Sequence, residues 1–207
     1  MIDTPTSRRA QKRTYHHGDL LSAALLRSRE TVALCGPEAL TLRGLARDLG
    51  VTAPALLYHF GTQAGLRSAV AASVLQDAEK MAFAAAPGAT RAAPEVVGAA
   101  WIAYAEQNPF LYRLASGEGW RHQTGAASGL DPGPLVVPSP RRVLQAGFAH
   151  RTRRLGLPAD AALRAEYLLR AEYLAFTIHG LAIARLDGAS VDLVAEALAQ
   201  LRDRTGD

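Results

Sequence analysis

Residues 41–60, TLRGLARDLGVTAPALLYHF, decide how the fold of this chain is interpreted. Leu42, Leu45 and Leu49 recur every three to four residues and form one apolar stripe of a short helix. Gly50 follows this helix, where the chain needs a positive φ that glycine adopts without strain. The first half of the stretch is therefore predicted to be a short helix that ends in a tight turn.

The second half of the stretch predicts another short helix. Thr41 and Thr52 are suited to cap the two helices, and Pro54 lies in the first turn of the second one, where its missing N–H does little harm. Leu56 and Phe60 are four residues apart and would anchor this helix to a core. Two short helices joined by such a turn are typical of a helix-turn-helix, whose second helix enters the DNA major groove. A plain helical hairpin of a bundle is the alternative that the pattern leaves open.

Helical spacing continues on both sides of this hairpin, and no strand-like alternation persists. We expect a first helix from Asp19 to about Leu34 and a long fourth helix from Gln63 to Ala85. Further helices are expected over 93–107, 110–115, 141–155, 160–186 and 191–204, and a loop over 117–140. The predicted fold class is all-α: an N-terminal three-helix helix-turn-helix domain followed by a C-terminal helical bundle. The predicted boundaries are a basic arm over 1–14, a DNA-binding domain over 15–62 and a second domain over 63–207.

The charge of the chain is concentrated at its beginning. The net charge of the 207 residues is +4, and residues 1–60 hold eight Arg and Lys against five Asp and Glu. A basic front end suits phosphate, although short basic tails also occur as solubility features. One cysteine, no long apolar run and no signal-peptide core predict a cytoplasmic protein without a membrane span.

Sequence motifs of enzymes are missing from the chain. It has no Gly-x-Ser-x-Gly elbow, no phosphate loop and no carboxylate pair that suggests acid–base catalysis. His16 and His17 stand next to each other, but no Cys or carboxylate lies at a spacing useful for a metal. We therefore expect no catalytic residues, no metal site and no cofactor.

The residues around the hairpin resemble a known family. The segments YHHGDL at 15–20 and GPEAL at 36–40, the hairpin itself and Leu66 look like the DNA-binding domain of the TetR/AcrR transcriptional regulators, over about residues 13–72. Further along, Trp101, Tyr112 and the HGLA segment at 179–182 resemble the subtype of C-terminal domain that has a Trp and a His-Gly pair. The resemblance implies a homodimer through the last two long helices, a cavity for a small-molecule effector, and release of operator double-stranded DNA when the effector binds.

The resemblance also assigns roles in DNA binding. Arg43 matches a position that reaches a base or phosphate, and Arg is well suited to the guanine edge. The other positions matched are the start of the third helix, its end and the basic arm: Thr52, Ala53, Pro54 and Ala55, Tyr58 and His59, and Lys12 and Arg13. Readout by the two alanines and the proline would be apolar, for example of thymine methyl groups.

Three departures from the family pattern stand out. Leu57 replaces a usual Tyr, and Gln63 replaces a usual Lys, which removes one hydroxyl and one charge from the expected phosphate contacts. The aromatic residue expected just before the His-Gly pair is shifted or missing, since Ala175 precedes Phe176. The first two departures leave open an alternative function, a TetR-like protein with weakened DNA binding that acts through a protein partner.

Aromatic residues of the second domain are candidates for a ligand pocket, because such pockets are mostly apolar with a few polar groups. The candidates are Trp101, Tyr104, Phe110, Tyr112, Tyr173, Phe176 and His179. The same residues could equally fill the core of the domain, and a histidine on an apolar helix is often a hydrogen-bonded core residue. The leading interpretation is a ligand-responsive repressor that binds palindromic operator DNA as a dimer.

Overall fold

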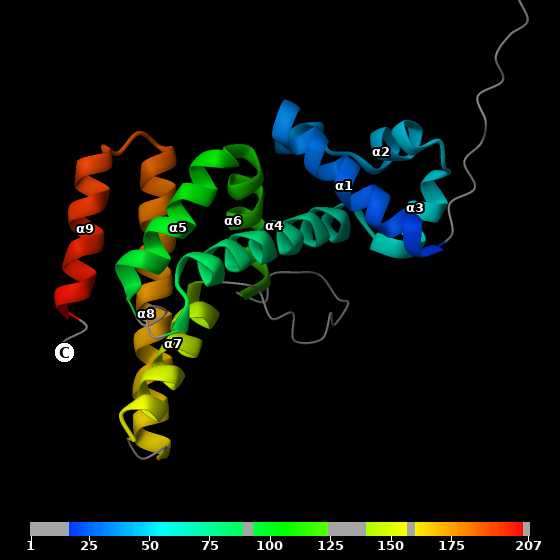
Figure 1. Ribbon diagram of the computed structural model, residues 1–207. Helices are drawn as coiled ribbons and strands as arrows, with labels where there is room; N and C mark the ends of the chain where they lie inside the picture. The colour runs from blue at the N-terminus through cyan, green and yellow to red at the C-terminus, as the bar shows by residue number, and fades with distance from the viewer. Residues whose placement is uncertain (1–16, 89–92, 124–139, 157–159, 205–207) are drawn as a thin grey trace, which may run out of the picture.

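A computed structural model describes residues 17–88, 93–123, 140–156 and 160–204 (Figure 1). The N-terminal domain begins with α1 (His17–Cys35) and the 3-10 helix η1 (Pro37–Ala39). The short helices α2 (Leu42–Leu49) and α3 (Ala53–Phe60) follow. These bounds agree with the predicted helix-turn-helix to within one residue at each end.

The remaining helices form the body of the molecule. They are α4 (Gln63–Ala85), α5 (Pro94–Gln107), α6 (Pro109–Gln123), α7 (Pro140–Arg154), α8 (Ala161–Leu186) and α9 (Val191–Arg204). Within the described ranges every regular element is a helix and none is a strand. The predicted all-α fold class is therefore confirmed.

The turn between α2 and α3 has the local geometry that the sequence indicates. The hydroxyl of Thr41 accepts a hydrogen bond from the backbone N–H of Gly44 at 3.0 Å and caps α2. Gly50 adopts the left-handed conformation, with φ 66° and ψ 28°, and ends that helix. The N–H of Val51 then donates to the carbonyl of Ala46 at 3.0 Å, which closes the turn. Leu56 and Phe60 are buried, as expected of residues that anchor α3.

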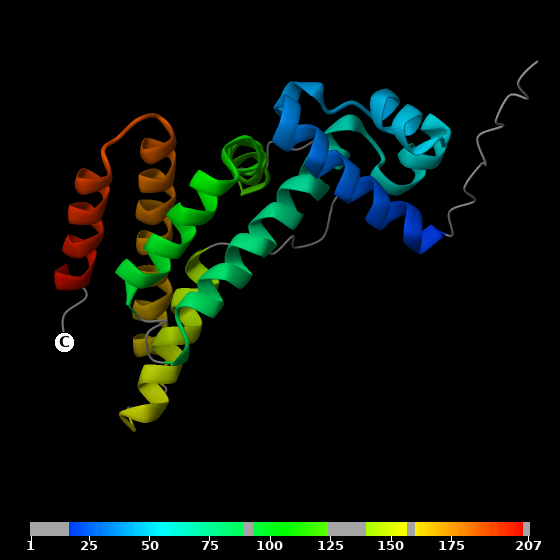
Figure 2. The same cartoon turned by 45° about the horizontal axis from the view of Figure 1, so that its top comes forward.

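Helix α4 connects the N-terminal helices to the body of the molecule. It starts beside α3, packs against α1, and continues into the body, where it contacts α5, α6 and α7 (Figures 1 and 2). Its buried residues include Leu66, Val70, Val74, Ala78 and Ala82, which recur every four residues on one face. One continuous helix therefore contributes buried residues from the helix-turn-helix through to the body.

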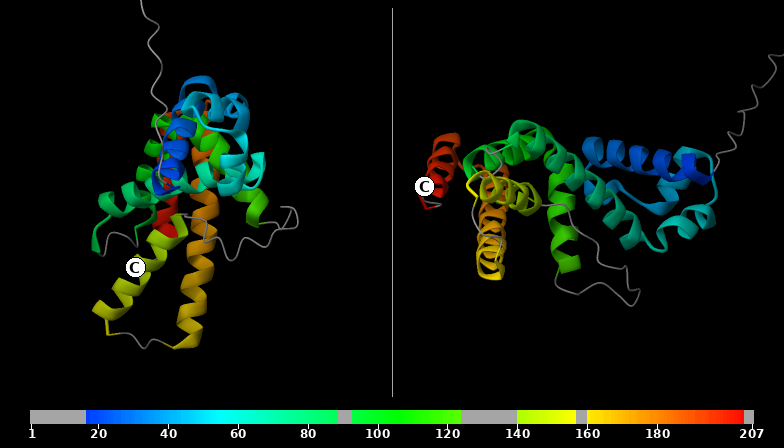
Figure 3. Two further views of the ribbon diagram at one scale, coloured as in Figure 1. Left: turned by 90° about the vertical axis from the view of Figure 1, so that its right-hand side faces the viewer. Right: turned by 60° about the horizontal axis from the view of Figure 1, so that its bottom comes forward.

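Helices α7 and α8 form a hairpin that projects from the rest of the body. The second half of α8 packs against α5 and α9, whereas its first half lies beside α7 and extends beyond the other helices (Figures 1 and 3). Among the described helices, none is long and apolar enough to cross a membrane.

Three details differ from the predictions. Helix α6 continues to Gln123, so the beginning of the loop expected over 117–140 is helical, and residues 124–139 lie outside the described ranges. Helix α1 begins at His17, which places Asp19 inside its first turn rather than at the cap. The element η1 follows Gly36, because Pro37 at its first position favours a tight helical turn there.

Candidate functional site

The exposed face of the helix-turn-helix carries four of the nine side chains predicted to bind DNA: Arg43, Thr52, Pro54 and Tyr58. Arg43 and Arg47 are exposed on α2, and Thr52 and Pro54 are exposed at the start of α3. Tyr58, near the end of α3, is 80% exposed. These side chains come from the two helices that a helix-turn-helix presents to the backbone and the major groove.

The other predicted positions on α3 lie closer to the protein. Ala53, Ala55 and His59 are half-buried, and the His59 ring meets that of Tyr58 edge to face, with centroids 5.4 Å apart. Leu57 is 41% exposed beside them. The two basic residues of the arm, Lys12 and Arg13, lie outside the described residues.

Thr52 occupies the N-cap position of α3 in an extended conformation, but its side chain makes no capping hydrogen bond. The position of the expected cap is therefore correct, but the prediction that the Thr52 hydroxyl accepts a hydrogen bond there is wrong. The reason is local. Pro54 has no N–H to offer, and the N–H of Ala55 donates to the backbone carbonyl of Thr52 at 3.1 Å. The exposed hydroxyl of Thr52 remains available to a phosphate oxygen.

Gln63 has a structural role. The sequence alone shows only that it replaces a usual lysine and so removes a charge. Its Oε1 accepts from the N–H of Leu42 at 2.8 Å, and its Nε2 donates to the carbonyl of Leu40 at 2.6 Å. The side chain thus ties the start of α2 to the start of α4 through one donor and one acceptor. A lysine could supply the donor but not the acceptor.

The junction behind Gln63 is tightly packed. A Cβ atom at Gly65 would collide with the carbonyl oxygen of Phe60. Because glycine has no side chain, the end of α3 can lie directly against the first turn of α4. The hydroxyl of Thr62 accepts from the N–H of Gly65 at 2.9 Å and caps α4. These contacts fix the direction in which α4 leaves the helix-turn-helix.

A second junction joins α1 to the body. The guanidinium of Arg29 lies 2.8 Å from the carboxylate of Asp77 and donates to the hydroxyl of Ser73 at 3.2 Å, both on α4. Tyr104 of α5 is 6% exposed, and burial raises the pKa of its hydroxyl, whereas the charge of Arg29 lowers it. Tyr104, one of the predicted ligand residues, therefore lies close to this domain junction.

Three other predicted ligand residues form a buried hydrogen-bonded chain across α5, α6 and α8. The indole N–H of Trp101 donates to the hydroxyl of Tyr112 at 2.9 Å, and that hydroxyl is 2.8 Å from Nδ1 of His179. Burial raises the pKa of Tyr112 and lowers the pKa of His179. A neutral imidazole keeps an acceptor nitrogen, so the hydroxyl of Tyr112 can donate to it.

The last three aromatic candidates are on the surface. Phe110 of α6 is 45% exposed, and Tyr173 and Phe176 of α8 are 54% and 46% exposed. The structure thus brings Trp101, Tyr112 and His179 together and places the other candidates elsewhere.

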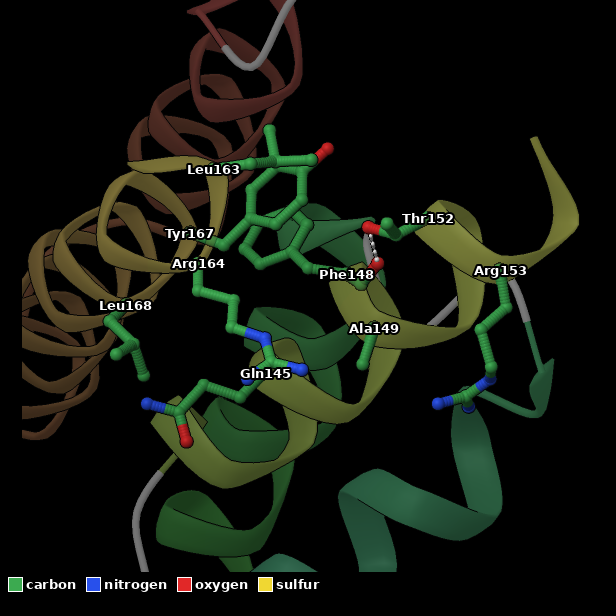
Figure 4. Close-up of a pocket in the computed structure, with 9 residues that line it drawn as sticks. All are labelled: Gln145, Phe148, Ala149, Thr152, Arg153, Leu163, Arg164, Tyr167 and Leu168. Atoms are coloured by element: carbon green, nitrogen blue, oxygen red, sulfur yellow. Dashed lines mark hydrogen bonds between the residues drawn. The ribbon is translucent and has the colours of Figure 1, made fainter. Parts of the chain in front are cut away.

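A cavity that the sequence did not reveal lies between α7 and α8 (Figure 4). Its volume is about 410 Å³, and its wall includes Phe148, Thr152, Arg164 and Tyr167. The stacking of Phe148 on Tyr167 joins residues 19 positions apart on two helices, which helical periodicity cannot predict. Within the part of the chain that the structure describes, no group of three His, Cys, Asp or Glu side chains is placed to hold a metal ion.

Solved structures share this fold. A protein of unknown function from Rhodococcus sp. RHA1 superposes with a TM-score of 0.53 at 24% identity, over 93% of this chain and 96% of its own. SCO7222, a TetR transcriptional regulator from Streptomyces coelicolor, superposes with a TM-score of 0.56 at 19% identity, over 87% and 86%. Comparison of the sequence with protein-family models and with curated proteins gives no match. The chain therefore has a TetR-like fold.

Proposed function

We propose that this protein is a ligand-responsive transcriptional repressor that binds palindromic operator DNA as a homodimer and is released by a small molecule. The observation that carries the proposal is the exposed face of α2 and α3, which presents Arg43 and Arg47 on the first helix and Thr52 and Tyr58 at the two ends of the second. The TetR-like fold supports the same function, and no part of the proposal requires catalysis.

In the proposed interface, some residues contact the DNA backbone and others contact the bases. Thr52 and Tyr58 present hydroxyls to phosphate oxygens, which position the protein without reading sequence. Arg43 reaches a guanine edge or a phosphate, and the apolar surface of Pro54 fits a thymine methyl group. Lys12 and Arg13 add positive charge from the arm.

The proposed dimer uses α8 and α9. Ala165, Leu169, Tyr173, Phe176 and Gly180 are exposed and lie along one face of α8. That face is opposite the buried residues of the helix, and a Cβ at Gly180 would meet open space, so a second helix could approach closely. Val191 and Leu193 of α9 are 63% and 59% exposed. A long apolar stripe of this kind on a soluble helix indicates a partner surface.

Release of DNA follows from a two-state equilibrium. An effector shifts that equilibrium only by the difference between its affinities for the two states. Helix α4 belongs to both domains, so a change in its orientation would alter the spacing of the two α3 helices. That spacing must match half-sites about 34 Å apart for both to bind.

The experiment is selection of the purified protein against a random DNA library, followed by titration of the enriched sequence across a salt series. We expect a palindrome whose affinity falls as salt rises. Arg43→Ala should weaken specific binding, whereas Arg154→Ala, at the exposed end of α7, serves as the matched control. A folded dimer that enriches no sequence at low salt would refute the proposal and favour the alternative regulator that acts through a protein partner.

A further inference from the structure

The cavity between α7 and α8 is large enough for a small molecule. Its volume of about 410 Å³ falls within the range of roughly 300–1,000 Å³ that is usual for ligand pockets. None of its lining residues belongs to the hydrogen-bonded chain of Trp101, Tyr112 and His179. The cavity is therefore a separate feature of the projecting hairpin.

One wall of the cavity is apolar. The rings of Phe148 and Tyr167 stack with centroids 5.1 Å apart and planes inclined by 11°, which joins the two helices. Leu163, Leu168 and Ala149 also line the cavity, and Figure 4 shows Leu163 and Ala149 next to the stacked rings. Such a surface favours the apolar body of a ligand over water.

The polar groups of the cavity are basic or neutral. Arg153 and Arg164 line it together with the amide of Gln145, and among the described residues no acidic one does. The hydroxyl of Thr152 donates to the carbonyl of Phe148 at 2.9 Å, so its proton is not available to a ligand (Figure 4). The side chain of Arg164 extends from α8 toward Gln145 of α7 in the same view.

Two arginines at the start of α7 have carboxylate partners. Arg141 pairs with Glu172 at 3.0 Å, and Arg142 pairs with Glu79 at 3.2 Å. Among the residues that the structure describes, the guanidinium of neither Arg153 nor Arg164 has an ion-pair or hydrogen-bond partner. Two unpaired positive charges thus stand beside an apolar wall.

We infer that this cavity binds a small amphipathic carboxylate, with the carboxylate on Arg164 and the apolar body against Phe148 and Tyr167. A planar guanidinium offers a carboxylate two parallel hydrogen bonds. One carboxylate suffices for the guanidinium of Arg164, and the apolar wall suits an uncharged remainder of the ligand. The inference deepens the proposed function by naming the chemical class of the effector.

The same hairpin contacts the helix that both domains share. Arg142, on α7, donates to the carboxylate of Glu79 on α4, and Glu79 is 7% exposed. A ligand that changes how α7 packs against α8 would therefore act on a contact with α4. This contact gives the site a physical connection to the DNA-binding domain.

The test uses the full chain without DNA. The fluorescent anion 1-anilinonaphthalene-8-sulfonate is bound first and then displaced by octanoate or by octan-1-ol, which share an apolar chain and differ in charge. We expect octanoate to displace the probe at a concentration at least about tenfold lower than octan-1-ol, as expected for a charge-assisted hydrogen bond. Arg164→Gln should remove this difference, and Arg170→Gln, the same change on α8 outside the cavity, should preserve it.

A cavity-filling variant locates the site. Ala149 is exposed at the rim, so Ala149→Trp can fill the cavity without entering the core, and it should abolish displaceable probe binding. Equal displacement by octanoate and octan-1-ol, or probe binding unchanged in Ala149→Trp, would overturn the inference. Octanoate selectivity in a protein that enriches no DNA sequence would instead refute the proposed function and leave the site standing.

Discussion

The amide of Gln63 is expected to stabilise the helix-turn-helix, and replacing Gln63 by alanine tests this directly. Gln63→Ala removes two hydrogen bonds, from the N–H of Leu42 at 2.8 Å and to the carbonyl of Leu40 at 2.6 Å. The N–H of Leu42 is in the first turn of α2, where helices offer no internal acceptor. Because each such bond contributes about 1 kcal/mol, the free energy of unfolding should fall by about 2 kcal/mol.

Urea unfolding followed by far-ultraviolet circular dichroism measures this change. In a chain of this length, a loss of about 2 kcal/mol corresponds to a Tm lower by roughly 4–8 °C. Gln76→Ala is the matched control, because Gln76 is exposed on the same helix. A difference below about 0.5 kcal/mol between Gln63→Ala and the wild type would refute a stabilising role for the amide.

The lysine that the family pattern expects at this position separates stability from DNA binding. Gln63→Lys keeps a donor for the carbonyl of Leu40 but leaves the N–H of Leu42 without its acceptor, so we expect a loss of about 1 kcal/mol. The added charge should steepen the salt dependence of DNA binding by about 0.9 per phosphate contacted. A variant as stable as the wild type, with an unchanged salt slope, would contradict both parts of the reasoning.

Further predictions concern the DNA interface, the buried polar chain and the dimer. Arg43→Ala should weaken specific DNA binding by about 1–3 kcal/mol in a binding titration. Tyr112→Phe leaves the buried indole N–H of its partner without an acceptor, so unfolding in urea should show a loss of about 1–3 kcal/mol. Burial lowers the pKa of His179 below 6.5, so the unfolded state binds more protons there. Unfolding free energies measured across pH should therefore be highest above pH 6.5 and fall as the pH decreases below it, and His179→Gln should flatten that fall. Leu169→Asp should yield monomers in light scattering after size-exclusion chromatography, whereas Leu26→Asp, on an exposed site of α1, should not.

The helix-turn-helix was predictable because its determinants are local. Thr41 caps the helix that follows it, Gly50 adopts the positive φ of the turn, and Pro54 lies in a first helical turn that needs no N–H from it. Each effect involves only residues close in sequence. The same local reasoning failed at Thr52, since it did not include the backbone bond that already occupies the N–H of Ala55. It also ended the helix of residues 110–115 too early, since α6 continues through Gly117 to Gln123.

The sites of the body were less predictable because they depend on contacts between distant residues. Gln63 meets backbone groups 21 and 23 positions earlier in the chain, and no local pattern indicates that contact. Helical spacing shows that α8 is apolar on several faces. It does not show that Tyr167 faces α7 while Tyr173 faces outward. The sequence therefore identifies the aromatic residues, but it does not show which of them contact one another.

The arrangement of contacts along α4 limits how an effector can influence DNA binding. Gln63 fixes the first turn of α4 to the helix-turn-helix, the ion pair between Arg29 and Asp77 fixes its middle to α1, and Glu79 meets Arg142 of α7. Asp77 and Glu79 are two residues apart, so α1 and α7 contact α4 at nearly the same position along its axis but on different faces. A ligand between α7 and α8 that left the Glu79–Arg142 contact unchanged would bind both states equally by this route and shift nothing. A tenfold loss of DNA affinity instead requires that the ligand prefer the released state at least tenfold. This preference corresponds to about 1.4 kcal/mol. One charge-assisted contact, such as the Glu79–Arg142 ion pair, is of that order.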